Sequence, residues 1–118
     1  MISFIKGIVS YIGDSYIVLD CHDIGFQISM PSTALYQVSE GMETVIYTHM
    51  AVKEDDMSLY GFLRREDLEM FRQLLTVSGI GPKVALAALS SYAPDQLAKL
   101  IAAQDVAAVQ RIPGIGKK

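Results

Sequence analysis

Residues 77–83 read VSGIGPK and residues 112–118 read IPGIGKK, so the chain twice carries Gly-Ile-Gly followed closely by lysine. The first copy follows REDLEMFRQLLTV (65–77), whose apolar residues recur at helical spacing, and precedes PKVALAALSSY (82–92), which is rich in helix formers. A helix that ends in glycine and restarts within three residues predicts a helical hairpin. The repeat therefore predicts two such hairpins in the second half of the chain.

The two glycine turns have the chemistry of a phosphate site. Backbone N–H groups in such a turn, and in the first turn of the new helix, lack helical partners. Glycine allows a phosphate oxygen to approach the main chain closely, and the helix dipole favours its negative charge. Ile80 is expected to turn inward and hold the two helices together. The predicted phosphate-binding residues are Ser78, Gly79, Ile80, Gly81 and Lys83 in the first copy and Gly114, Ile115, Gly116, Lys117 and Lys118 in the second.

A tight turn with no ligand is the alternative, since Gly-x-Gly often joins two helices for packing alone. The second matching copy, with its own lysines, favours phosphate binding. A site of this kind recognises the sugar–phosphate backbone and not the base sequence.

The first half of the chain has the pattern of strands. Five are predicted, over residues 2–12, 15–21, 24–30, 43–53 and 57–63, and GFQISM is expected to place Phe26, Ile28 and Met30 on one face. A short helix is predicted in PSTALYQV (31–38), with Pro31 in its first turn. Further helices are predicted over residues 95–104 and roughly 105–111. We therefore expect an α+β chain, with a five-stranded OB-type barrel over residues 1–63 and a helical domain over residues 64–118.

Composition limits the class of protein. The chain has 118 residues, of which 51% are hydrophobic, which suffices for a packed core. Cys21 is the only cysteine, so neither an internal disulfide nor a multi-cysteine zinc site is possible. No run of residues is apolar enough for a membrane span or a signal peptide, so we expect a cytoplasmic protein with no membrane partner.

The charge is unevenly distributed. Residues 1–63 contain two basic and eight acidic residues, a net charge of −6, whereas residues 64–118 contain eight basic and five acidic residues, a net charge of +3. The overall charge of −3 argues against a nucleic-acid-binding protein, but the positive second half carries both glycine turns.

Taken together, the barrel, THMAVKEDDMSLYGF, GIGPKVALAALS and PGIGKK closely resemble the RuvA family of Holliday-junction-binding subunits, over the whole chain. The resemblance implies tandem helix-hairpin-helix motifs and a non-catalytic, structure-selective DNA-binding subunit with no cofactor. It also implies a homotetramer around four-way junction DNA, with an octamer left open, and as partners the RuvB motor and the RuvC resolvase. Family members continue past the second hairpin to a motor-binding domain, so we expect this form to bind junctions without stimulating the motor.

Three adjacent carboxylates, Glu54, Asp55 and Asp56, are predicted to lie between two strands. A solvated turn is the ordinary interpretation, and a Mg²⁺ site would need further ligands. The resemblance implies instead an acidic pin at the junction centre, which Glu54 and Asp55 match best. Carboxylates there would repel phosphate and select against single duplexes.

Other candidate sites are assigned to structure. Cys21 and His22 are expected to be successive strand residues that point to opposite faces, so they cannot form a catalytic dyad. His49 is interpreted as a barrel residue, and no metal site is predicted. No nucleotide-binding GxxxxGK[ST] motif occurs, so no ATP hydrolysis is expected. Two rival functions remain at this point: a helix-hairpin-helix DNA repair enzyme fragment and an RNA-binding assembly module.

Overall fold

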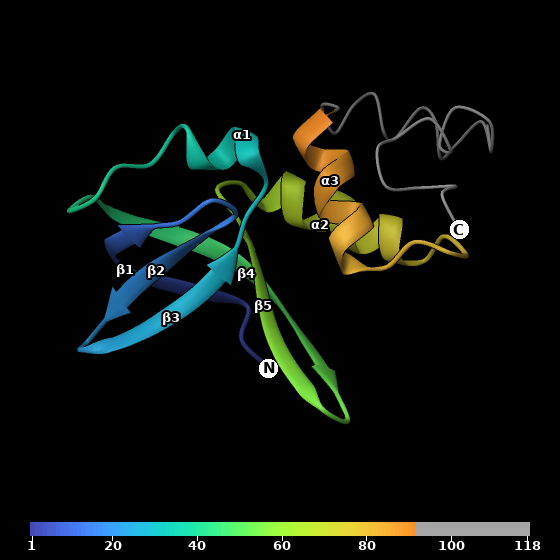
Figure 1. The fold of residues 1–118 in the computed structure, drawn as a ribbon, viewed down its shortest axis with the longest axis horizontal. Coiled ribbons are helices and arrows are strands. Elements are labelled where there is room, and N and C mark those ends of the chain that lie inside the picture. The colour runs from blue at the N-terminus through green and yellow to red at the C-terminus, as the bar shows by residue number, and fades with distance from the viewer. Residues whose placement is uncertain (92–118) are drawn as a thin grey trace. The chain divides into compact units, whose positions relative to one another are not determined.

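The computed structural model describes residues 1–91 (Figure 1). By its internal contacts the chain divides into two units, one from Met1 to Leu68 and one from Glu69 onward. The helices predicted over residues 95–104 and 105–111, and the second glycine turn, lie outside the described residues. The domain boundary proposed between residues 63 and 64 stays a prediction.

Five strands close into a barrel in the first unit, which confirms the predicted fold class. They are β1 (Phe4–Ile12), β2 (Tyr16–Cys21), β3 (Ile24–Ser29), β4 (Glu43–Lys53) and β5 (Asp56–Phe62). The order around the barrel is β1-β2-β3-β5-β4. All neighbours are antiparallel except β3 and β5, which run parallel and pair only at Ile28–Leu59 and Ser29–Tyr60.

The barrel core follows mainly from alternation along the strands, which is most regular in β1 and β2. Every second residue points inward, and Ile17, Leu19, Ile28 and Ile46 are fully buried. Of the three residues predicted to share a face of β3, Ile28 and Met30 are buried, and Phe26 is half-buried and packs against the core. Burial of this apolar face is the main stabilising contribution to the unit.

Gly61 lies where two core side chains leave no room for a methyl group. A β-carbon at this position would lie 2.5 Å from both Ile28 Cγ2 and Ile46 Cγ2. We expect Gly61→Ala to lower the free energy of unfolding by about 1–3 kcal/mol, because an overpacked core must move side chains off their rotamers. Urea denaturation measures this. Gly25→Ala is the control, since its methyl would meet only Val18 Cγ1, at 3.1 Å, and equal losses for the two variants would contradict the expectation.

Two local predictions need correction. Pro31 is not in the first turn of α1 (Ser32–Leu35) but precedes it as the N-cap, with extended backbone at φ −64° and ψ 149°. His22 is not a strand residue: with Asp23 it forms the two-residue turn between β2 and β3, at φ 52° and 70°. Positive φ at both positions matches the turn type whose twist suits a hairpin. The argument that Cys21 and His22 point to opposite faces of one strand therefore does not apply, because His22 lies in the turn.

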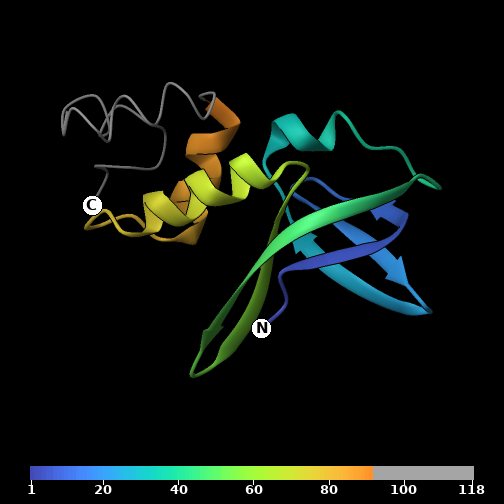
Figure 2. The same ribbon diagram turned by 180° about the vertical axis from the view of Figure 1, so that it is seen from behind.

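Strands β4 and β5 extend beyond the barrel as a two-stranded ribbon, visible at the bottom of Figure 1 and from behind in Figure 2. β1 pairs with β4 only as far as Tyr47. Residues 51–53 and 56–58 pair only with each other, and we call residues 51–58 the β4–β5 arm. The arm projects the acidic residues away from the barrel wall.

The helical hairpin consists of α2 (Arg65–Leu75) and α3 (Pro82–Ser91). The predicted apolar face of α2 is confirmed: Leu68, Phe71 and Leu74 are buried and Leu75 is half-buried. Pro82 begins α3, as predicted, where its missing N–H costs nothing. Ala85, Ala88 and Leu89 form the buried side of α3.

Candidate nucleic-acid interface

The first glycine turn follows the C-terminal end of α2. The N–H groups of Thr76 and Val77 donate to the carbonyls of Gln73 and Leu74, at 3.1 and 3.0 Å, and so close the last turn of the helix. The N–H of Ile80 then donates to Val77 O at 3.2 Å, which makes residues 77–80 a β-turn. Gly79 is the third residue of this turn and has φ +86°, a conformation that favours glycine.

The turn is open to solvent on both sides of one anchored residue. Ser78, Gly79, Gly81 and Lys83 are exposed, whereas Ile80 is buried, as predicted. Within residues 1–91, a β-carbon added to Gly79 or Gly81 would meet no atom within 4 Å. The space in front of both glycines is therefore available to a ligand atom.

The turn also presents unused backbone donors. Gly81 caps α3, since its carbonyl accepts the N–H of Ala85 at 3.0 Å. The N–H groups of Gly79, Gly81, Lys83 and Val84 have no hydrogen-bond partner among residues 1–91. Together with the positive end of the helix dipole, they make this end of α3 suited to an anion.

Ile80 differs from the other predicted phosphate-binding residues. Its N–H is already donated to Val77 and its side chain is buried, so we assign it to supporting the turn. Val84 N–H was not singled out from the sequence. The available signal is Pro82, because a proline at the first helical position makes the next two N–H groups the open donors.

The charge at the start of α3 is opposite to what helix stability favours. The first turn of α2 contains Glu66 and Asp67, whereas the first turn of α3 contains no acidic residue and carries Lys83. A cation at a helix N-terminus is unfavourable unless an anion is bound there. The charge of Lys83 therefore does not stabilise the helix through its dipole, and its role in binding phosphate stays a prediction.

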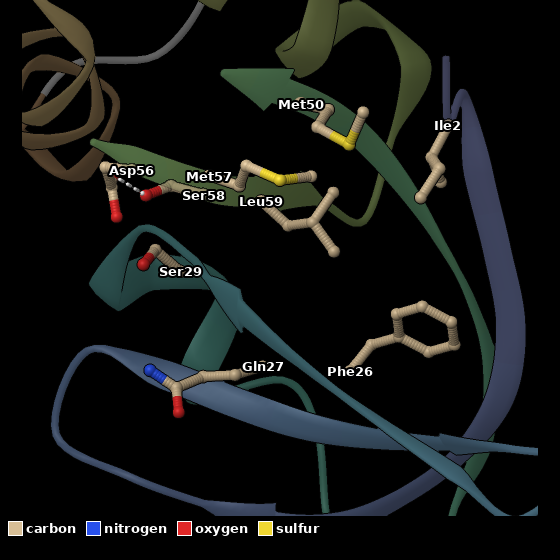
Figure 3. A pocket seen from close by; sticks show the side chains of 9 residues that line it. All are labelled: Ile2, Phe26, Gln27, Ser29, Met50, Asp56, Met57, Ser58 and Leu59. Carbon is tan, nitrogen blue, oxygen red and sulfur yellow. Dashed lines mark hydrogen bonds between the residues drawn. The ribbon is translucent and has the colours of Figure 1, made fainter. Parts of the chain in front are cut away.

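The tip of the β4–β5 arm consists of Glu54 and Asp55, both exposed. The prediction that Asp56 also lies between the strands is wrong: Asp56 is the first residue of β5 and pairs with Lys53. Its carboxylate Oδ2 accepts a hydrogen bond of 2.6 Å from the Ser58 hydroxyl (Figure 3). Two residues connect the strands, so Glu54 and Asp55 form the tip. The carboxylate of Asp56 belongs to β5 and is bonded to Ser58 of the same strand.

Beside the arm lies a pocket of about 480 Å³ with mixed lining. Figure 3 shows Phe26 and Gln27 of β3 on one side and Met57 and Leu59 of β5 on the other. The remaining lining residues are Ile2, Ser29, Met50, Asp56 and Ser58. None of the described residues that line the pocket is basic, so they are unsuited to phosphate.

His49 and Cys21, which the sequence assigned to structure, both lie in strands of the barrel. His49 is half-buried on β4 opposite Tyr60, and Cys21 is half-buried at the end of β2. Within residues 1–91, no three His, Cys, Asp or Glu side chains are grouped to hold a metal ion. In the same range, no helix is both long and apolar enough to cross a membrane.

The second glycine turn, Gly114, Ile115, Gly116, Lys117 and Lys118, lies beyond the residues that the structure describes. Its role as a second phosphate site therefore stays a prediction.

Comparison with known proteins agrees with both halves of the architecture. Residues 1–61 match the family described as RuvA N terminal domain, and residues 71–118 match the SAM-like Helix-hairpin-helix tandem. Two relatives, each named Holliday junction branch migration complex subunit RuvA, are those of Lachnospira eligens, 49% identical, and Stenotrophomonas maltophilia (strain K279a), 44% identical. Both alignments cover all of this chain and 58% and 60% of the relatives, so the chain spans about three fifths of their length. The chain belongs to the RuvA family.

Proposed function

We propose that this chain is a structure-selective, sequence-independent binder of four-way DNA junctions and a non-catalytic subunit of a branch-migration complex. The observation that carries the proposal is the exposed Gly79–Lys83 turn, which offers unpaired N–H groups and a lysine at one helix end. Backbone donors and a lysine at a helix N-terminus bind phosphate without reading bases. The relatives' shared name supports junction DNA as the substrate.

Junction selectivity then comes from assembly and not from the turn itself. One glycine turn would bind any duplex, so several copies must be arranged to match the four arms. We propose a homotetramer in the cytoplasm, with an ATP-driven motor and a resolvase as further partners. An acidic barrel unit suits this arrangement, because its negative charge keeps DNA on the helical units.

A three-way binding comparison tests the proposal. Fluorescence anisotropy is measured with an immobile four-way junction, a linear duplex of the same sequence and a hairpin RNA. We expect the junction to bind at least tenfold more tightly than the other two, roughly 1.4 kcal/mol or more. Equal affinity for all three would reject junction recognition, and preference for the RNA would favour an RNA-assembly role. Cleavage of a duplex that carries a damaged or abasic site would favour the repair-enzyme alternative.

The two carboxylates at the arm tip are proposed to exclude ordinary duplex DNA. Neutralising both, with Glu54→Gln and Asp55→Asn, should raise duplex affinity roughly two- to fivefold, since two like charges near phosphate in water are worth about 0.5–1 kcal/mol. Junction affinity should change less, so the ratio of the two dissociation constants falls. Glu40→Gln with Glu43→Gln removes the same charge from exposed positions off the arm. The pin assignment fails if the control pair lowers the ratio equally.

A further inference from the structure

Arg72 lies on the last turn of α2, on the solvent face that leads into the glycine turn. The exposed residue Arg72 lies three residues after Glu69 and four before Thr76, so these three exposed residues share one side of the helix end. Arg72 precedes Thr76 by about 6 Å along the helix axis. Arg72 therefore lies on the same side of the helix as Thr76, about one helical turn before the glycine turn begins.

Among residues 1–91 its guanidinium has no ion-pair or ring partner, in contrast to those of Arg64 and Arg65. Arg64 forms an ion pair with Asp67, with Nη2 and Oδ1 3.2 Å apart. The Arg65 Cζ atom lies 5.2 Å from the centre of the Tyr47 ring. Within residues 1–91, Arg72 has neither an ion pair nor a ring contact, although Glu69 lies three residues before it.

The spacing of phosphates makes Arg72 useful to a strand bound at the turn. Successive phosphates of one DNA strand are about 3.4 Å apart along the duplex axis. A strand that places one phosphate on the Gly81–Val84 donors has neighbouring phosphates within the length of the last α2 turn. Guanidinium is well suited to such a contact, because its planar fork pairs with two phosphate oxygens at once.

We propose that Arg72 binds a second phosphate of the strand held by the Gly79–Lys83 turn, which makes the first hairpin a two-phosphate clamp. The inference rests on the proposed DNA-binding function and extends its site to α2. Arg72 also opposes the negative end of the helix dipole, but that role affects stability and not the dependence of binding on salt.

The test is the salt dependence of DNA affinity for Arg72→Gln. We expect the slope of log K against log [salt] to fall by about 0.9 for each bound copy, and affinity at 0.1 M salt to fall about eightfold per contact. Arg72→Lys should retain the slope because the charge remains. Arg64→Gln is the matched control and should leave the slope unchanged, since that guanidinium is paired with Asp67. Circular dichroism confirms that each variant is folded.

The outcomes separate this inference from the proposed function. An unchanged slope for Arg72→Gln, beside a reduced slope for Lys83→Gln, overturns the Arg72 contact and leaves the proposed function in place. Loss of junction preference in the unmodified chain overturns the proposed function. In that case the slope of Arg72→Gln on linear duplex still decides whether Arg72 contacts phosphate.

Discussion

Lys83→Glu should abolish most junction binding while leaving the protein at least as stable as before. Removing one phosphate contact costs about 0.9 in the salt slope, or roughly eightfold in affinity at 0.1 M salt, for each copy that touches DNA. The new carboxylate adds repulsion, and in a tetramer the loss is repeated at every contact. Anisotropy titrations at several salt concentrations measure both quantities.

The stability of the same variant should move in the opposite direction. The first turn of α3 has no acidic residue, so a glutamate there pairs favourably with the helix dipole and is worth about 0.3–1 kcal/mol. Urea denaturation measures this gain. Lys6→Glu makes the same charge reversal at an exposed barrel position and should change binding far less. A destabilised Lys83→Glu protein, or equal binding losses for the two variants, would contradict the assignment.

Gly81→Ala should produce the second large loss of affinity, again without unfolding. The added methyl would meet no atom of residues 1–91 within 4 Å, and under the proposed function it crowds the space through which a phosphate oxygen approaches the main chain. Helix N-caps tolerate glycine better than alanine by about 0.5–1 kcal/mol, and alanine recovers about 0.4–1 kcal/mol by restricting the unfolded chain. Stability should therefore stay nearly constant while junction affinity falls about tenfold or more, the equivalent of one lost contact.

Gly79→Ala is the comparison that separates backbone conformation from access. Gly79 has φ +86°, a region that costs a residue with a β-carbon about 1–2 kcal/mol. This variant should lose stability as well as affinity, whereas Gly81→Ala loses affinity alone. Unimpaired junction binding by folded Gly81→Ala would show that the main chain at this turn does not meet phosphate.

Much of the barrel could be predicted because its strands obey a two-residue period. Ile17, Leu19 and Ile28 alternate with exposed or half-buried residues, and each strand begins and ends within two residues of its predicted bounds. The amphipathic face of α2 was predictable from a different period, since Leu68, Phe71 and Leu74 have helical spacing.

The parts that could not be predicted depend on contacts between distant residues. Asp56 was grouped with Glu54 and Asp55 because the three are adjacent, but strand register places it opposite Lys53. Thr48 looks like any polar strand residue. It is nevertheless fully buried. Its hydroxyl donates a hydrogen bond of 2.8 Å to Ile2 O, which satisfies the buried group and joins the N-terminal segment to β4. A local sequence pattern does not show which residues lie opposite each other on neighbouring strands.

The glycine turn shows the same limit at the candidate phosphate site. The glycine motif indicated a turn whose main chain is open to a ligand, and Gly79 and Gly81 are exposed. The motif did not show which N–H groups remain available, because that depends on the bond from Ile80 N–H to Val77 O. The charge count likewise showed that the second half of the chain is positive, but it did not distinguish Arg64, which is paired with Asp67, from Arg72.

The central claim is that the main chain at this turn binds phosphate, and amide NMR tests it without any mutation. Junction DNA is titrated into isotope-labelled protein, and the N–H signals of Gly79, Gly81, Lys83 and Val84 are followed. We predict that these four shift together and saturate at the same DNA concentration, while Ile80 and the barrel strands shift less. Shifts confined to the barrel, with the four turn signals unmoved at saturation, would contradict the claim.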